Sequence, residues 1–428
     1  MIVYGYNEFL GGINMKKIII LVASIIILLL MSFGGILISQ NYILEKQNER
    51  TSKIVEEEIF QVSNYENKTI EEKENSIVVV LEEKEDIKVS MSVIGDIMCH
   101  NSQYNDAHQN GTYDFSYVFE DIKQYIENSD VAIGNLETTF AGKVKGYSSY
   151  PNFNTPENLA QDLKELGIDI LSTANNHSLD TGYSGIESTI NYLDEAGIEH
   201  IGTYKSEEAQ NEVLIKDVNG MKIAFLAYTY GTNGISIPKG REYCINLINK
   251  DLILKQLESV KNQKPDVICV NMHWGEEYQT MPNNEQKKLS EFLFQNGVDI
   301  ILGSHPHVLQ PMESKTIILP NGNEKNGFVI YSLGNFMSGQ DKENTRNSII
   351  LMFDIIKSGK TGKIRIENVS YIPIYTFTSP KYKNYKVIDI IKNMSMYENG
   401  ESEIINKNNY NILKKELEHV NLIMTSGL

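Results

Sequence analysis

The chain has 428 residues, and its 39 Lys and Arg residues against 56 Asp and Glu residues give a formal net charge of −17 at pH 7. Because the phosphates of nucleic acids attract basic surfaces, this balance argues against a nucleic-acid partner. The length is sufficient for a large buried core together with segments outside it.

The N-terminal region contains a long apolar run, which follows Lys16 and Lys17 and has no charged residue over 18–38. Roughly 20 apolar residues in a helix are enough to cross a bilayer. We therefore expect a single transmembrane helix at 18–40. The alternative is a cleaved signal peptide, which has a shorter apolar core and an A-x-A-like cleavage site, and no such site follows here.

The paired lysines indicate that residues 1–17 form a cytoplasmic N-terminus. This orientation predicts a single-pass protein of the cell membrane, with the C-terminal domain outside the cytoplasm. Both Met1 and Met15 are possible start residues. Residues 41–87 are polar and acidic, with EEE at 56–58 and EEKED at 82–86, and predict a solvated linker.

Three cysteines occur in the chain, namely Cys99, Cys244 and Cys269. Cys99 follows an apolar run and Cys269 lies within one. This placement favours buried free thiols over a disulfide framework.

From residue 88 onward, short apolar runs alternate with amphipathic stretches, a pattern that predicts an α/β domain with largely parallel pairing. The predicted strands are 89–95, 130–134, 169–174, 222–230, 266–272, 298–303 and 328–334. Predicted helices at 155–167, 183–197 and 284–297 each end at a glycine, as helix C-termini often do.

Two later runs, 347–355 and 363–377, have no helix between them and predict antiparallel strands at a sheet edge or in a second layer. The expected domain therefore covers 88–377. Residues 378–428 form a C-terminal extension whose role the sequence leaves open.

Five of the predicted strands end in short clusters of residue types that bind metals. The clusters contain Asp96; Asn135 and Glu137; Asn175, Asn176 and His177; His273, Glu276 and Glu277; and His305 and His307. Ligands of α/β sheets bind beyond the carboxyl ends of the strands, so these clusters are expected to converge. Carboxylate, amide and imidazole ligands together suit one or two divalent ions such as Mn, Zn or Fe.

Each cluster alone has a simpler explanation. Asp96 fits an ordinary turn after a strand, Asn175 to His177 fit a helix cap, and His273 fits packing beside Trp274. The two histidines of GSHPH are a stronger signal, because burying an unpartnered imidazole is costly.

In this order, the segments GDIM, GNLE, ANNHSLDTG, HWGEEY, GSHPHVLQ and YSLGNF resemble the CapA family of poly-γ-glutamate capsule biosynthesis proteins, over roughly 89–376. That family resembles a divergent branch of the calcineurin-like metallophosphoesterases. The resemblance implies a layered sandwich of sheets flanked by helices. It also implies contact with an anionic polymer such as poly-γ-glutamate and with other membrane proteins of capsule synthesis and export.

The resemblance further implies roles for individual residues. The metal ligands would be Asp96, Glu137, Asn176, His273, His305 and His307, with Asp96 and the proton donor His177 as the catalytic residues. Met98 stands where the superfamily has a histidine, and His100 is a possible substitute. Asn135 stands where a bridging acid is expected, so Glu137 is the better carboxylate.

Further residues are expected near the ligands or the substrate, each with a simpler alternative. Glu276 and Glu277 also fit a solvated acidic loop, Asp180 a helix cap, and Asn335 a plain turn. The residues in this second set are Asn135, Asn175, Asp180, Glu276, Glu277, His100 and Asn335.

Three functions fit these features. The first is a capsule biosynthesis protein whose metal-dependent, hydrolase-like site cleaves or transfers the γ-glutamyl polymer. The second is a phosphoesterase, and the third is a non-catalytic export or scaffold component. Arginines that clamp phosphate are scarce in the expected outer domain, which contains Arg241, Arg346 and Arg365, and this favours a substrate without phosphate.

Overall fold

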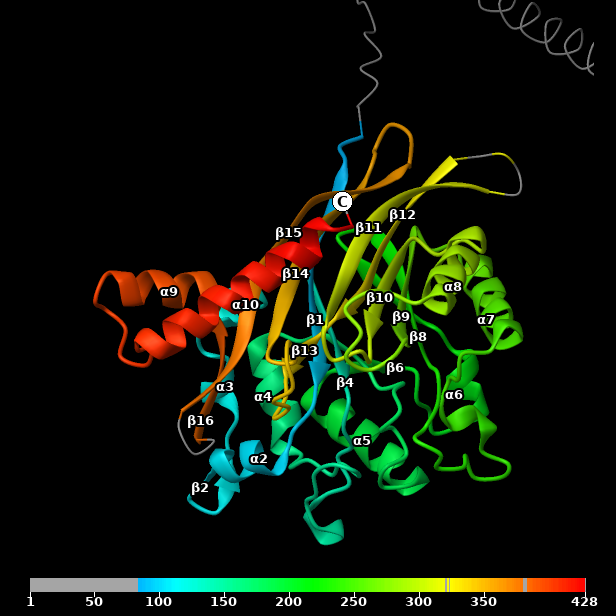
Figure 1. Ribbon diagram of the computed structural model, residues 1–428. Helices are drawn as coiled ribbons and strands as arrows, with labels where there is room; N and C mark the ends of the chain where they lie inside the picture. Colours follow the sequence, from blue (N-terminus) through cyan, green and yellow to red (C-terminus); the bar gives the residue numbers. More distant parts are fainter. Residues whose placement is uncertain (1–83, 320–321, 323, 380–382, 428) are drawn as a thin grey trace, which may run out of the picture. The chain divides into compact units, whose positions relative to one another are not determined.

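The computed structural model describes residues 84–319, 322, 324–379 and 383–427 (Figure 1). The predicted cytoplasmic N-terminus, the transmembrane helix at 18–40 and most of the linker lie outside the described residues. Among the residues that are described, no helix is both long enough and apolar enough to cross a membrane.

The first sheet has a parallel half and an antiparallel half. The parallel half pairs β1 (Ile87–Ile97), β4 (Val131–Leu136), β5 (Ile170–Ser172) and β6 (Glu199–Ile201), in that order. On the other side of β1, the antiparallel half pairs β14 (Asn347–Lys357), β15 (Ile364–Ser379) and β16 (Lys383–Asp389). The short strand β13 (Asn335–Met337) runs parallel to the end of β1. The predicted antiparallel edge is thus confirmed.

The second sheet has a parallel centre made of β8 (Met221–Thr229), β9 (Val267–His273), β10 (Ile300–Ser304) and β12 (Glu324–Leu333). An antiparallel strand closes each edge, β7 (Leu214–Val218) beside β8 and β11 (Leu309–Ile318) beside β12. The strands predicted between 89 and 334 are all present.

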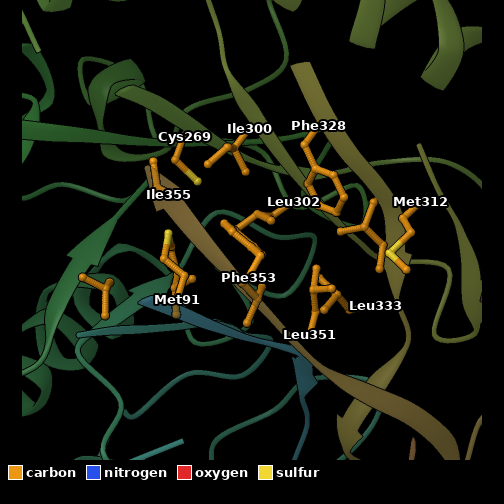
Figure 2. Close-up of a cluster of buried hydrophobic side chains, with 14 of the residues drawn as sticks. Met91, Cys269, Ile300, Leu302, Met312, Phe328, Leu333, Leu351, Phe353 and Ile355 are labelled. Atoms are coloured by element: carbon orange, nitrogen blue, oxygen red, sulfur yellow. The ribbon is translucent and has the colours of Figure 1, made fainter. Parts of the chain in front are cut away.

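The main core lies between the two sheets, where apolar side chains from alternate strand positions meet (Figure 2). Met91 and Phe353 from the first sheet and Leu302 and Phe328 from the second belong to this cluster and are almost fully buried. Cys269 is a free, buried thiol in the same core, and the other cysteines are free and buried as well. The prediction of free thiols is confirmed.

Helices cover the outer face of each sheet. α4 (Asn158–Leu166) and α5 (Tyr183–Ala196) pack on the first sheet, and α7 (Lys250–Asn262) and α8 (Asn284–Gln295) pack on the second. Gly167 and Gly197 adopt left-handed conformations that end α4 and α5. Asn249 and Asn283 cap the first backbone amides of α7 and α8. The predicted α/β architecture, with sheets flanked by helices, is therefore confirmed.

Smaller elements fill the connections. They are α2 (Asn101–Ala107), β2 (His108–Gln109), β3 (Thr112–Tyr113), α3 (Ser116–Phe119), α6 (Glu207–Asn211) and the 3-10 turns Lys123–Tyr125, Lys143–Lys145 and Glu242–Cys244.

The C-terminal segment is integrated into this fold. β16 completes the first sheet, and it is followed by α9 (Ile390–Glu398) and α10 (Lys407–Thr425), which lie side by side (Figure 1). α10 buries Val420, Ile423 and Met424 in the core between the sheets. The extension whose role the sequence left open is thus part of the packed unit.

Candidate metal centre

Strand register aligns several of the predicted residues side by side. Across β13, β1 and β4, Asn335 pairs with Asp96 and Asp96 pairs with Asn135. In the second sheet, His273 on β9 pairs with Ser304 at the end of β10. Asp96, Asn135, His273 and Ser304 lie at or near the carboxyl ends of parallel strands, where α/β sheets bind their ligands, and Asn335 is the first residue of β13.

Side-chain contacts connect the ends of the two sheets. Asn135 Nδ2 donates a hydrogen bond to Asp96 Oδ1 at 2.9 Å and lies 3.3 Å from His273 Nδ1. His273 Nε2 lies 2.6 Å from Asn176 Oδ1, and His307 Nδ1 lies 3.3 Å from Asp96 Oδ2. The strand-end clusters therefore meet at one buried place, as the sequence predicted.

Two groups of donor atoms at this place have metal-binding geometry. One contains Glu137, His273 and His305, and the other contains Asp96, Glu137 and His307. Within each group the ligand atoms lie within 4.8 Å of one another, and every residue is buried. Glu137 belongs to both groups, so its carboxylate could serve as a ligand in either one.

Several of these donor atoms have no hydrogen-bond partner among the described residues. Both carboxylate oxygens of Glu137, Oδ1 of Asn135 and Nδ1 of His305 are buried and unpartnered. Leaving a polar group buried and unsatisfied costs roughly 1–3 kcal/mol, and a charged group costs more. A divalent cation would satisfy these oxygen and nitrogen donors together, so the residues present fit a metal ion.

Burial and charge shift the protonation of this cluster. Burial, followed by the charge of Asp96 nearby, raises the pKa of Glu137 well above its usual value. Burial also lowers the pKa of His305 to about 3 and the pKa of His273 well below its usual value, with smaller contributions from neighbouring histidines. Neutral imidazoles are the form that binds metals.

The backbone that carries the two histidines of GSHPH adopts an unusual conformation. His305 has φ of +97° and His307 has φ of +60°, a region that side-chain-bearing residues rarely occupy. The backbone amide of His305 points at Asp96 Oδ2 at 3.3 Å, and Tyr278 N donates to Pro306 O at 2.8 Å. These contacts hold the turn in a conformation that directs both imidazoles toward the carboxylates.

His177 lies beside this cluster with a partner of its own. Its Nδ1 lies 2.7 Å from Asp180 Oδ2, and the same oxygen accepts a hydrogen bond from Phe153 N at 2.6 Å. Asp180 is therefore the partner of His177, whereas the residue before α5 is Gly182. Asn175 instead holds the local turn, because its Nδ2 donates to Leu136 O and its Oδ1 accepts from His177 N.

Other predicted residues lie at the edge of the donor cluster. Glu276 and Glu277 are exposed, and the charge of Glu277 contributes to the raised pKa of Glu137 after burial and Asp96. His100 belongs to neither donor group, and its Nδ1 accepts a hydrogen bond from Gly339 N at 3.0 Å. Asn335 Oδ1 lies 3.2 Å from His307 Nδ1.

Three further residues contact the donor cluster and were not predicted from the sequence. Ser304 Oγ lies 3.0 Å from His273 Nδ1, and Asn233 Oδ1 accepts a hydrogen bond from Asn176 Nδ2 at 3.0 Å. The half-exposed Tyr230 ring lies 4.5 Å from the His305 ring, measured between centroids. Ser304 adjoins His305 in the sequence, which was a usable signal, whereas nothing local marks Asn233 or Tyr230.

Comparisons with known proteins give relatives for most of this unit. Residues 90–340 match the profile of a family described as "Bacterial capsule synthesis protein PGA_cap". The "Capsule biosynthesis protein CapA" of Bacillus anthracis is 30% identical over 289 residues, which cover 66% of this chain and 67% of that protein. The "PGA biosynthesis protein CapA" of Bacillus subtilis (strain 168) is 29% identical over 281 residues, 65% of this chain and 70% of that protein.

Among solved structures, the calcineurin-like phosphoesterase YfkN from Bacillus subtilis superposes with a TM-score of 0.39 at 14% sequence identity. That superposition covers 67% of this chain and 90% of the other.

Proposed function

Since this chain belongs to the PGA_cap family of bacterial capsule synthesis proteins, we propose that it processes an anionic capsule polymer such as poly-γ-glutamate at a divalent-metal centre. The proposed reaction is cleavage or transfer of the γ-glutamyl chain. We also propose that the layered sandwich is a divergent form of the calcineurin-like metallophosphoesterase fold.

The observation that carries the proposal is the meeting of strand-end clusters around unpartnered donors. A purely structural site would pair buried carboxylates and imidazoles with hydrogen-bond donors and acceptors. Here both oxygens of Glu137 and Nδ1 of His305 are buried without such a partner in the described part of the chain. Such a constellation suits the binding of a cation.

In this proposal, the ligands are Asp96, Glu137, Asn176, His273, His305 and His307. A bound divalent ion would act as a Lewis acid that polarises the bond under attack and lowers the pKa of a water nucleophile.

The residues of the chain have distinct tasks around that bond. Asp180 faces Nδ1 of His177, so the opposite ring nitrogen, Nε2, is left to hold the proton that the leaving amine takes up. Ser304 and Asn135 approach Nδ1 of His273 and fix the orientation of its ring. Asn233 fixes the amide of Asn176 in the same way.

The proposal also concerns location and partners. We place the helix predicted at 18–40 in the cell membrane as a single-pass anchor, with the metal centre outside the cytoplasm. Support comes from the uncharged run after Lys16 and Lys17 and from the polymer named in the relative's description, "PGA biosynthesis protein CapA". Other membrane proteins of capsule synthesis and export would be the partners.

The positions of the arginines favour the polymer over a phosphoester. Arg365 pairs with Asp86 and Glu367, and the guanidinium of Arg241 lies 3.6 Å from the ring centroid of Tyr183. Within the described residues, no arginine makes an ion pair or hydrogen bond with the donor cluster. Phosphate recognition usually recruits such a guanidinium.

The test uses the full chain purified in detergent, with metal content measured by mass spectrometry before and after Mn²⁺ is added. The protein is then incubated with poly-γ-glutamate, whose chain length is followed by gel electrophoresis. We expect polymer shortening that His273→Ala reduces by at least about 100-fold, because that change removes a ligand of the centre. His108→Ala, at an exposed histidine, is the matched control and should keep full activity.

Other outcomes would redirect the assignment. Turnover of a generic phosphodiester without polymer shortening would identify a phosphoesterase. A protein that binds no metal and shortens nothing, but crosslinks to a membrane partner, would identify a non-catalytic component.

A further inference from the structure

A lysine lies at the rim of the metal centre. The Nζ atom of Lys342 is 3.6 Å from the ring centroid of Tyr278, and the Tyr278 ring is 6.1 Å from the His307 ring, measured between centroids. An ammonium over a tyrosine face is attracted by the electrons of the ring, which holds the lysine in place without neutralising its charge.

The loops that carry this pair are fastened to the site itself. Tyr278 N donates a hydrogen bond to Pro306 O, between the two histidines of GSHPH, at 2.8 Å. The carbonyl of Lys342 accepts hydrogen bonds from Thr345, both from its backbone N and from its Oγ1. The carbonyl of Thr345 in turn accepts from Asn335 Nδ2 at 2.9 Å, and Asn335 contacts His307. The position of Lys342 is therefore linked to the position of the ligands.

The charge of Lys342 is also uncommitted. Among the residues that the structure describes, Lys342 forms no ion pair, whereas Lys325, Lys357 and Lys392 bind Asp299, Asp266 and Asp121. Lys342 is exposed to solvent, and the two carboxylates of the donor cluster, Asp96 and Glu137, are fully buried. The ammonium is thus available to an anionic group that arrives from outside.

We propose that Lys342, held over Tyr278, is a binding site for a carboxylate of the substrate. The inference rests on the proposed function, because it assigns this carboxylate to the polymer processed at the metal centre. In a γ-linked glutamate chain, every amide bond lies a few atoms from a free α-carboxylate. A carboxylate bound by Lys342 places a neighbouring amide next to His307 and fixes which bond is presented. Lys342 is therefore a positioning residue that selects chains with a free carboxylate.

The experiment measures binding of a short γ-linked glutamate oligomer to the metal-loaded full chain by calorimetry. Lys342→Met removes the charge but keeps an apolar stem over the ring, and Lys342→Arg keeps the charge. Lys250→Met is the matched control, because Lys250 Nζ also lies over an aromatic ring, 5.0 Å from that of Phe292 on α8.

We expect Lys342→Met to weaken oligomer binding about 3- to 10-fold, the range typical of one solvent-accessible charge contact. Lys342→Arg and Lys250→Met should stay within about twofold of the wild type. The methyl-esterified oligomer, which lacks carboxylates, should bind weakly to every variant. In turnover assays, Lys342→Met should raise KM and leave kcat nearly unchanged, and bound metal should remain at the wild-type level.

Three results would overturn the inference. They are wild-type affinity in Lys342→Met, equal affinity for the esterified oligomer, and displacement of the oligomer by an equimolar amount of inorganic phosphate, which would indicate a general anion site. Failure of the proposed function looks different. If the wild type cleaves nothing while binding still requires Lys342, the carboxylate site stands and the hydrolytic role falls.

Discussion

The donor set shows what single residues can and cannot reveal. Asp96, Glu137, His273, His305 and His307 belong to clusters that follow apolar strands, and the family resemblance implies that they are metal ligands. The structure brings them together. Candidate metal ligands of this kind can be predicted from residue type and position in the sequence. The contacts of Ser304 and Asn233 could not be predicted from the sequence. They depend on the register between strands and on contacts between residues far apart in the chain.

His305 makes stability depend on pH in a defined direction. Its pKa in the folded protein, lowered by burial to about 3, lies below the value of about 6.5 expected in an unfolded chain. Between these values the unfolded chain binds a proton and the folded chain does not. The contribution of His305 is therefore complete above pH 6.5 and is lost as the pH falls toward 3.

The test compares metal-free wild type with His305→Asn by urea unfolding at pH 6.5 and pH 5. The wild type should lose about 1.5 kcal/mol more than the variant over this interval, because the slope rises from about half of 1.4 kcal/mol per pH unit at pH 6.5 to nearly the full value at pH 5. His108→Asn, at an exposed position, should follow the wild-type profile. Parallel profiles for His305→Asn and the wild type would contradict the assignment.

Among the elements, strands and helices with strong periodicity were predictable. The run at 89–95 appears as β1, and the stretches at 155–167 and 183–197 appear as α4 and α5 with their terminal glycines. The three residues of β13 were not predictable as a strand, because so short a segment is extended only through its pairing with β1. This pairing is what sets Asn335 beside Asp96.

The contact between β1 and the turn before β13 requires a glycine at position 95. A Cβ atom on Gly95 would lie 1.9 Å from the carbonyl oxygen of Gly334, whereas Gly231 has no atom within 4 Å of the corresponding position. The same carbonyl accepts the hydrogen bond of Asp96 N at 2.9 Å. Any relief of the clash therefore moves Asp96.

We expect Gly95→Ala to lower the free energy of unfolding by about 1–3 kcal/mol, the usual cost of overpacking, and to reduce metal content. Gly231→Ala, the control, should remain within about 0.5 kcal/mol of the wild type. Chemical denaturation and metal analysis measure both effects. Unchanged stability and metal binding in Gly95→Ala would show that the β1–β13 contact adjusts freely.

For the described unit as a whole, the alternation of strands and helices predicted an α/β core and the family resemblance implied layered sheets, but neither indicated that the C-terminal segment completes the core. Alternating strands and helices predict an α/β core, yet the weak helical pattern after residue 378 gives no sign of where that segment packs. The structure shows that α10 supplies Val420, Ile423 and Met424 to the core formed by both sheets. Packing of this kind depends on long-range contacts, which local periodicity does not encode.

Two neighbouring positions on α10 test whether this helix stabilises the core between the sheets. Val420 is fully buried, whereas Leu422 is 66% exposed. Val420→Asp would bury an unpaired carboxylate and should lower the free energy of unfolding by at least about 3 kcal/mol. Leu422→Asp should change it by less than about 0.5 kcal/mol, as measured by thermal or chemical unfolding. Similar values for both variants would show that α10 contributes little to the core.

The length of β1 has a consequence for how a substrate reaches the donor cluster. Its 11 residues run unbroken from Ile87 to the neighbourhood of the donors, a span of roughly 35 Å at the usual rise per residue. Ile87 therefore lies at one end of this strand, and Asp96 lies beside the other end, next to the donor histidines. A long, charged substrate would therefore reach the donor cluster at the end of β1 that is farthest from Ile87.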